Sequence, residues 1–193
     1  MLFKILIGIA VVVVVAAILF AIAVAMQPDE FTVTRSTTIN APPSRVFAEV
    51  NSFQRWRSWS PWEKLDPNLK RTYEGPATGE GAEYAWEGNG NVGAGKMMIT
   101  ESRPSEQISI RLEFSRPFAA VNTTVFDFQP QGEQTVVTWT MTGKNSFMGK
   151  AMGLLMNMDK MVGGSFEEGL ASMKQVAEES AVGEDATTGP TEA

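Results

Sequence analysis

The sequence predicts an α+β protein in which an antiparallel sheet is covered by a long C-terminal helix and preceded by one apolar N-terminal helix. Three observations predict this architecture: an unbroken apolar run over residues 5–26, a series of strand-like runs between residues 69 and 143, and a 3.6-residue apolar period over residues 146–178. The length of 193 residues suits one domain with appendages.

The N-terminal run is long enough to cross a membrane. Residues 5–26 carry no charged or strongly polar side chain, and a helix of about 20 apolar residues spans a bilayer core of ~30 Å. The alternatives are a buried core helix and a cleaved signal peptide, whose apolar part usually has ~7–15 residues. Residues 23–25 read Ala-Val-Ala and resemble a cleavage box. We expect residues 1–27 to form an uncleaved membrane anchor.

The charges that flank this run predict its orientation. Lys4 precedes the run, and Asp29 and Glu30 follow it. Because basic residues favour the cytoplasmic side, we expect a single-pass membrane protein with a cytoplasmic N-terminus and an extracytoplasmic domain.

The first part of the body combines one strand with short helices. Period-2 alternation predicts a strand over residues 31–39, and Ser44 is suited to cap a helix over residues 45–51. Three tryptophans then recur at intervals of three within residues 56–62, where Pro61 prevents a long helix. These indoles could plug the core, form a membrane-interface patch or line a pocket.

The middle of the chain is predicted to be an antiparallel meander. Gly, Pro and Asn turns separate six candidate strands at intervals of about 8–12 residues. Apolar and polar residues alternate in two of these runs, which indicates a sheet with one buried and one solvated face. The candidate strands are residues 70–76, 82–88, 95–102, 107–114, 120–129 and 135–143.

The last predicted element is a single long helix over residues 146–178, followed by an acidic disordered tail over residues 179–193. Gly163-Gly164 interrupts the helical pattern, and two glycines each cost about 1 kcal/mol relative to alanine. We expect this pair to mark a kink or a close approach of the helix to the sheet. Residues 28–178 would then form one domain.

Composition excludes several classes of function. The chain has no cysteine and no histidine, so it has no disulfide, thiol nucleophile, zinc–thiolate site, His-ligated metal or Ser-His-Asp triad. The glycine-rich residues 88–93 match a dinucleotide motif, but a strand rather than a helix is predicted to follow. We therefore expect neither a metal nor a cofactor.

The charge distribution predicts no nucleic-acid partner. The net charge is −6, but five acids lie in residues 178–193, and residues 27–177 hold 15 basic and 17 acidic residues. A near-neutral body without basic clusters does not provide the electrostatic surface that nucleic acids require. The oligomeric state is not predicted by these features.

Three segments resemble a known family. The segments are Ile-Asn-Ala-Pro-Pro-Ser-Arg-Val-Phe at residues 39–47, Trp-x-x-Trp-Ser-Pro-Trp at residues 56–62, and Met-Thr-Gly at residues 141–143. Together with the order of elements they are similar to the START-like (SRPBCC) superfamily, which includes polyketide cyclase/dehydrase-type and Bet v 1-like proteins. The resemblance covers residues 31–178 and extends to bacterial members with an N-terminal membrane segment.

The resemblance implies a helix-grip fold, in which a curved antiparallel sheet wraps around the last helix and leaves an apolar cavity. Members bind lipids, sterols, polyketides or other hydrophobic molecules, and a few catalyse cyclisation or dehydration. A half-buried sheet needs a cover in any case, and apolar concavities are the usual small-molecule sites. No catalytic residue is predicted. The predicted ligand-binding residues are Trp59, Trp62, Tyr84, Trp86, Leu112, Phe114, Phe126, Trp139, Met141, Met152 and Leu155.

Three functions are compatible with these features. The first is a membrane-tethered binder or carrier of a hydrophobic small molecule or lipid, without catalysis. The second is a cyclase-like or hydrolytic enzyme, which requires a buried carboxylate that converges with Tyr73, Tyr84 or a lysine on the cavity. The third is an interaction module whose cavity is filled by its own side chains. The size and polarity of the cavity distinguish them.

Overall fold

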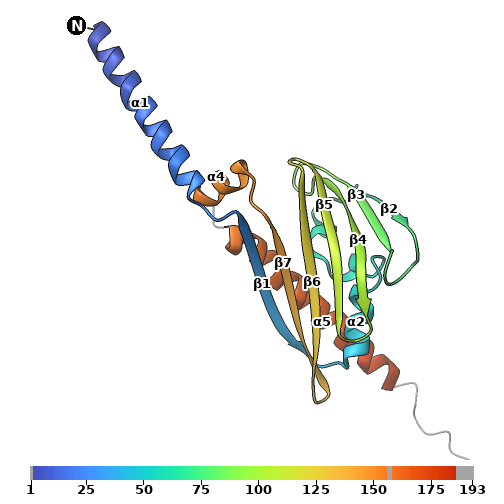
Figure 1. The fold of residues 1–193 in the computed structure, drawn as a ribbon. Helices are drawn as coiled ribbons and strands as arrows, with labels where there is room; N and C mark the ends of the chain where they lie inside the picture. The colour runs from blue at the N-terminus through green and yellow to red at the C-terminus, as the bar shows by residue number, and fades with distance from the viewer. Residues whose placement is uncertain (1, 156–157, 186–193) are drawn as a thin grey trace, which may run out of the picture.

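A computed structural model describes residues 2–155 and 158–185 of the chain. Seven antiparallel strands form one open sheet in the order β1-β7-β6-β5-β4-β3-β2 (Figure 1). The predicted α+β class and the predicted strands are therefore confirmed. The strands are β1 (Glu30–Ile39), β2 (Lys70–Glu74), β3 (Glu83–Glu87), β4 (Ala94–Arg103), β5 (Gln107–Arg116), β6 (Ala120–Gln131) and β7 (Gln134–Lys144).

The two ends of the sheet differ in what they carry. At one end β1 begins at Glu30, which pairs with Lys144 at the end of β7, and the β5–β6 turn at residues 117–119 lies at the same end. We call this the anchor end, because α1 (Leu2–Ala25) precedes β1 there and projects away from the domain (Figure 1). The far end carries the β6–β7 turn at residues 132–133.

The helix α1 is apolar after Lys4. Residues Phe3–Ala25 form a helix long and apolar enough to cross a membrane, and a signal sequence would have the same properties. The helix stands clear of the domain, since its most apolar stretch buries none of its residues.

Three short helices follow β1, and the tryptophan run contacts the end of the first one. They are α2 (Pro43–Val50), α3 (Trp56–Trp59) and the 3₁₀ helix η1 (Pro61–Lys64). The Nε1 atoms of Trp56 and Trp59 donate hydrogen bonds to the backbone oxygens of Val50, at 3.0 Å, and Glu49, at 3.1 Å. These oxygens lie in the last turn of α2, where carbonyls lack partners within the helix. Two of the three tryptophans thus complete the end of α2.

The C-terminal region differs from the prediction of one helix over residues 146–178. The structure has two helices, α4 (Phe147–Leu155) and α5 (Met158–Asp185). The apolar period belongs to α5, which buries Phe166, Leu170 and Met173 against the sheet, whereas α4 lies beside the base of α1 (Figure 1). Apolar residues occur in both helices, buried against the sheet in α5 and largely exposed in α4. The 3.6-residue period therefore did not reveal the boundary between the two helices.

The helix α5 also passes the predicted start of the tail. It extends to Asp185, so residues 179–185 are helical, and the rest of the predicted tail, 186–193, lies outside the described residues.

The glycine pair in α5 marks a close approach to the sheet. The helix continues through Gly163-Gly164, and a Cβ on Gly163 would lie only 2.0 Å from Nη2 of Arg35 on β1. Arg35 in turn pairs with Asp159, at 3.1 Å, and Glu167, at 2.6 Å, on either side of the pair. The glycine leaves room for a guanidinium that fastens α5 to the sheet edge.

Candidate functional site

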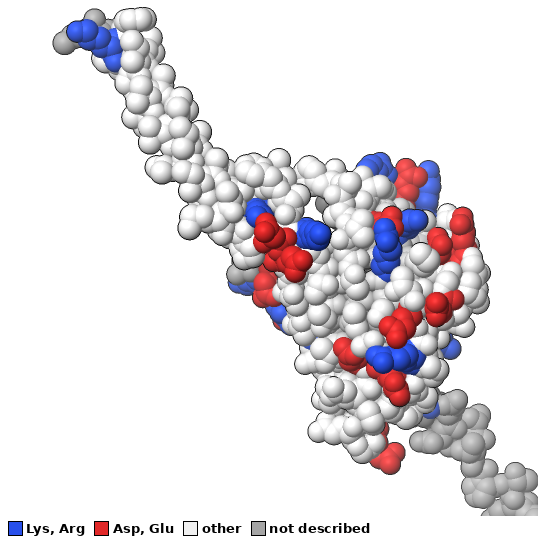
Figure 2. Space-filling view, viewed as in Figure 1, with Lys and Arg blue, Asp and Glu red and all other residues white. Residues whose placement is uncertain are grey.

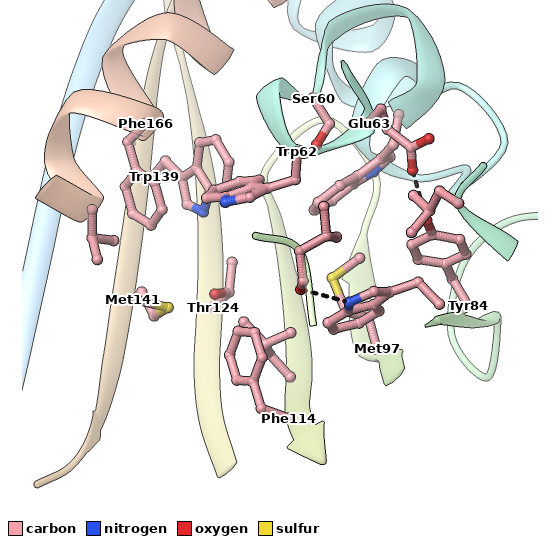
Figure 3. Close-up of a pocket in the computed structure, with 16 residues that line it drawn as sticks. Ser60, Trp62, Glu63, Tyr84, Met97, Phe114, Thr124, Trp139, Met141 and Phe166 are labelled. Carbon is pink, nitrogen blue, oxygen red and sulfur yellow. Dashed lines mark hydrogen bonds between the residues drawn. The ribbon is translucent and has the colours of Figure 1, made fainter. Parts of the chain in front are cut away.

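A cavity of about 180 Å³ lies between the sheet, η1 and the first turns of α5 (Figure 3). One water needs about 10–15 Å³ on this measure, so the cavity is larger than a few waters and is not filled by the protein's own side chains. Sixteen residues line it: Trp56, Ser60, Trp62, Glu63, Leu69, Tyr84, Trp86, Val92, Met97, Leu112, Phe114, Thr124, Trp139, Met141, Val162 and Phe166.

Strand alternation builds most of the wall. Three strands each contribute two residues that are two positions apart and therefore point to the same face of the sheet. The pairs are Tyr84 and Trp86 on β3, Leu112 and Phe114 on β5, and Trp139 and Met141 on β7. Cross-strand pairing joins them into rows: Tyr84 opposes Met97, and Met97 opposes Leu112.

Seven of the predicted ligand-binding residues lie on the cavity wall, and their contact with a ligand stays a prediction. These seven are Trp62, Tyr84, Trp86, Leu112, Phe114, Trp139 and Met141.

The other four predicted residues are not placed on the wall. Trp59 and Phe126 are fully buried in the core and do not reach the cavity. Met152 is exposed on α4, away from the cavity, and the side chain of Leu155 lies outside the described residues. Both were predicted on the cavity wall because a single helix over residues 146–178 was expected, whereas they belong to α4.

Several wall residues were missed by the sequence reasoning. Met97 and Thr124 follow from strand alternation, and Val162 and Phe166 follow from the helical period, so all four had a usable signal. Trp56 belongs to the tryptophan run for which pocket lining was one of three interpretations, and the others lie in loops and short helices without a periodic signal: Ser60, Glu63, Leu69 and Val92.

One wall of the cavity is a stack of aromatic rings. The ring of Trp139 lies flat on Phe166 of α5, with centroids 4.0 Å apart and planes at 6°, and packs on Phe126 at 4.7 Å. The ring of Trp62 meets Trp139 edge-on at 5.7 Å. The Nε1 atom of Trp139 is buried and finds no hydrogen-bond partner among the described residues. This wall is closely packed and apolar, with one unsatisfied donor.

The opposite corner is polar (Figure 3). The side chain of Glu63 is only 7% exposed. Its carboxylate accepts hydrogen bonds from the Tyr84 hydroxyl and from Nε of Arg71, each at 2.6 Å. Tyr73 stacks on Tyr84 with ring centroids 5.3 Å apart, and its buried hydroxyl has no partner in the described chain. Glu63 therefore contacts Tyr84 and Arg71 in this corner, and Tyr73 lies next to them through its stack on Tyr84.

Burial and the neighbouring Glu63 carboxylate raise the pKa values of Tyr73 and Tyr84. Burial raises the pKa of Tyr84 well above its usual range, and the hydrogen bond to Glu63 and its negative charge raise that pKa further. Burial also raises the pKa of Tyr73, to which the Glu63 charge adds. Both phenols keep their protons at neutral pH, so they can donate hydrogen bonds.

This polar corner has the arrangement that the enzyme hypothesis requires. That hypothesis required a buried carboxylate that converges with Tyr73 or Tyr84 on the cavity, and Glu63 and Tyr84 are both wall residues. The sequence analysis did not identify Glu63, because it lies in a short 3₁₀ helix far from Tyr84 in the chain. Among the described residues, no group of three or more acidic side chains could hold a metal ion.

Comparison with known proteins agrees with the fold. The model of the family described as polyketide cyclase/dehydrase and lipid transport matches residues 30–178. No curated protein matches the chain significantly in sequence.

Solved structures share the architecture at low identity. A Chromobacterium violaceum protein is 13% identical with a TM-score of 0.53, over 79% of this chain and 99% of that one. A protein from Nitrosospira multiformis is 18% identical with a TM-score of 0.54, over 75% and 94%. The di-domain ARO/CYC protein BexL of the BE-7585A biosynthetic pathway is 16% identical with a TM-score of 0.57, over 81% and 52%. At these identities the likeness concerns the fold alone.

Proposed function

The chain belongs to the polyketide cyclase/dehydrase and lipid transport family, and we propose that it binds or carries a hydrophobic small molecule or lipid while α1 tethers it to a membrane. In this proposal residues 5–26 are an uncleaved anchor, the N-terminus is cytoplasmic and the domain is extracytoplasmic. Lys4 before the span and the acidic pair after it support that orientation.

The observation that carries the proposal is the cavity itself. It is several waters in size and its wall is mostly aromatic and aliphatic. An apolar space of this kind favours apolar ligands, because filling it removes ligand surface from water without breaking protein hydrogen bonds. Its size argues against the interaction module with a filled cavity.

The test uses two neighbours on β6 as a matched pair. Thr124 lines the cavity and is 3% exposed, whereas Val125 points to the other face of the sheet. The full chain is incubated with a fatty acid of known mass in detergent and examined by native mass spectrometry. We expect a bound fatty acid on the wild type and on Val125→Phe, and loss of that mass on Thr124→Phe. Equal occupancy of both variants, or none on the wild type, would contradict the proposal.

The polar corner favours a second candidate, an enzyme that uses Glu63. A carboxylate held beside a protonated tyrosine could accept a proton from a bound substrate while the tyrosine donates one. In this case a membrane lipid extract incubated with the full chain would change in composition over time, as followed by mass spectrometry. Glu63→Gln would abolish that change but retain binding. An extract that stays unchanged with the wild type would argue against catalysis on those lipids.

A further inference from the structure

The helix α4 exposes apolar side chains where α1 leaves the domain. Phe147 is 61% exposed, Met148 52% and Met152 37%, and Ala151 is the buried residue of this helix in the described chain. A helix with this pattern lacks a protein surface to cover it, and large exposed apolar patches mark sites of interaction. The pattern therefore calls for an apolar partner.

Three contacts fix α4 to the base of α1. Asn145, just before α4, donates its backbone N–H to the oxygen of Asp29 at 2.8 Å and its side-chain amide to the oxygen of Pro28 at 3.1 Å. Lys150 of α4 forms an ion pair with the Asp29 carboxylate. Because Pro28 and Asp29 lie only three and four residues after the end of α1 at Ala25, α4 is held beside the point at which α1 would leave a bilayer.

The β5–β6 turn adds to the same surface. Phe118 in the turn is 64% exposed, and Val121 at the start of β6 is 53% exposed. Both lie at the anchor end, where the base of α1 and α4 also lie (Figure 1). Figure 2 shows α1 as a rod without charged residues up to the basic residue near its tip, and charged residues where the rod meets the domain.

Part of the cavity wall reaches this end. Three half-exposed wall residues lie where strands end or begin at the anchor end: Trp86 is the penultimate residue of β3, Val92 lies in the β3–β4 loop, and Phe114 is near the end of β5. The other half-exposed wall residues are Leu112 on β5, Trp62 and Glu63 on η1, and Val162 on α5. Tyr84 and Met97, farther along β3 and β4, are buried. Part of the accessible cavity wall and the exposed apolar residues therefore lie at the same end of the sheet.

We infer that the anchor end contacts the lipid bilayer and that an apolar ligand passes directly between the bilayer and the cavity. The bilayer-facing surface consists of Phe118, Val121, Phe147, Met148 and Met152. The proposal rests on the proposed membrane tether and ligand binding. The surface is continuous with the helix that would cross the bilayer, and its side chains gain by leaving water.

The first experiment tests contact with lipid. Because the chain has no cysteine, Met148→Cys and Phe118→Cys each provide a unique site for an environment-sensitive fluorophore. Gln129→Cys, an exposed site near the far end, is the control. In liposomes containing the full chain, we expect the fluorescence emission of labels at 148 and 118 to shift to shorter wavelength. We also expect spin-labelled lipid, but not iodide, to quench this emission. Labels at 148 and 118 that iodide quenches as strongly as the label at 129 would overturn the inference.

The second experiment tests passage of the ligand. Full-chain liposomes take up a fluorescent fatty acid from donor vesicles, and the rate and the final amount bound are measured separately. We expect Met148→Glu to slow uptake several-fold with the bound amount unchanged, because Met148 does not line the cavity, and Gln129→Glu to change neither. An unchanged rate in Met148→Glu would overturn direct passage. A wild type that binds nothing at equilibrium would refute the proposed function, whereas the label experiment would still decide the lipid contact.

Discussion

Gly169 of α5 lies directly against the ring of Trp139 on β7. A Cβ on this glycine would lie 3.0 Å from Cζ3 of Trp139 and 3.1 Å from Cδ of Pro61, the first residue of η1. The absence of a side chain thus allows the last helix, the sheet and the tryptophan segment to meet at one point. The indole held there forms a wall of the cavity.

This contact predicts different changes in stability when two glycines of the same helix are replaced by alanine. Gly164→Ala should stabilise the protein by about 1 kcal/mol, because nothing lies within 4 Å of its new Cβ and alanine favours the helix. Gly169→Ala should lose this gain, because an indole and a proline ring must move. Thermal unfolding of the full chain in detergent measures both. Equal stability of the two variants would show that the contact is not tight.

Trp139 should behave as part of the core. Trp139→Ala is expected to lower the free energy of unfolding by about 3–5 kcal/mol, since it leaves a cavity beside Phe166. Trp139→Phe should lower it less, because it also removes the buried N–H that has no partner. Denaturant unfolding followed by circular dichroism compares the three chains. A far smaller loss in Trp139→Ala, together with abolished ligand uptake, would instead make the indole mainly a pocket wall.

Trp59, which caps α2 and lies off the cavity wall, should differ from Trp62, which lines the cavity. Trp59→Phe keeps most of the ring but leaves the Glu49 carbonyl unsatisfied, so we expect a loss of about 1–3 kcal/mol. Trp62→Phe should be milder, because the Trp62 indole makes no hydrogen bond within the described residues and the backbone oxygen, which accepts from the Leu65 N–H, is unchanged. The same denaturant series gives both values. A loss in Trp62→Phe as large as that in Trp59→Phe would contradict a capping role for Trp59.

The chain's two tyrosines should make stability fall at high pH. The raised pKa of Tyr84 means that the folded state keeps a proton that the unfolded chain releases near about pH 10. This contribution to stability is therefore fully present below about pH 10 and is lost as the pH rises above it. Urea unfolding across this range should show a shallower decline in Tyr84→Phe. The Tyr73→Phe/Tyr84→Phe double variant should decline least, and an unchanged slope in both would exclude the buried phenols as the cause.

Sequence reasoning identified the strands and much of the cavity wall. Alternation located Leu112 with Phe114 and Trp139 with Met141, since side chains two apart share a face. The same rule does not give depth, so it did not distinguish Phe126, buried in the core, from Trp139, which reaches the cavity.

Two other features could not be obtained from local patterns. Glu63 and Tyr84 meet only because η1 folds over β3, and a long-range contact of this kind has no signal in either segment. The apolar residues of α4 read as a continuation of α5, because a residue exposed to lipid and one buried in protein have the same polarity. Periodicity reports apolar positions, but not the partner that covers them.

The direction of α5 has a practical consequence for how the protein is handled. Its 28 residues rise about 1.5 Å each, so the helix is roughly 42 Å long and ends on the side of the domain away from α1 (Figure 1). A label, affinity tag or fusion partner joined after this helix would therefore stand clear of the surface assigned to the bilayer. In the proposed topology, the same partner placed before α1 would lie with Lys4 on the other side of the membrane.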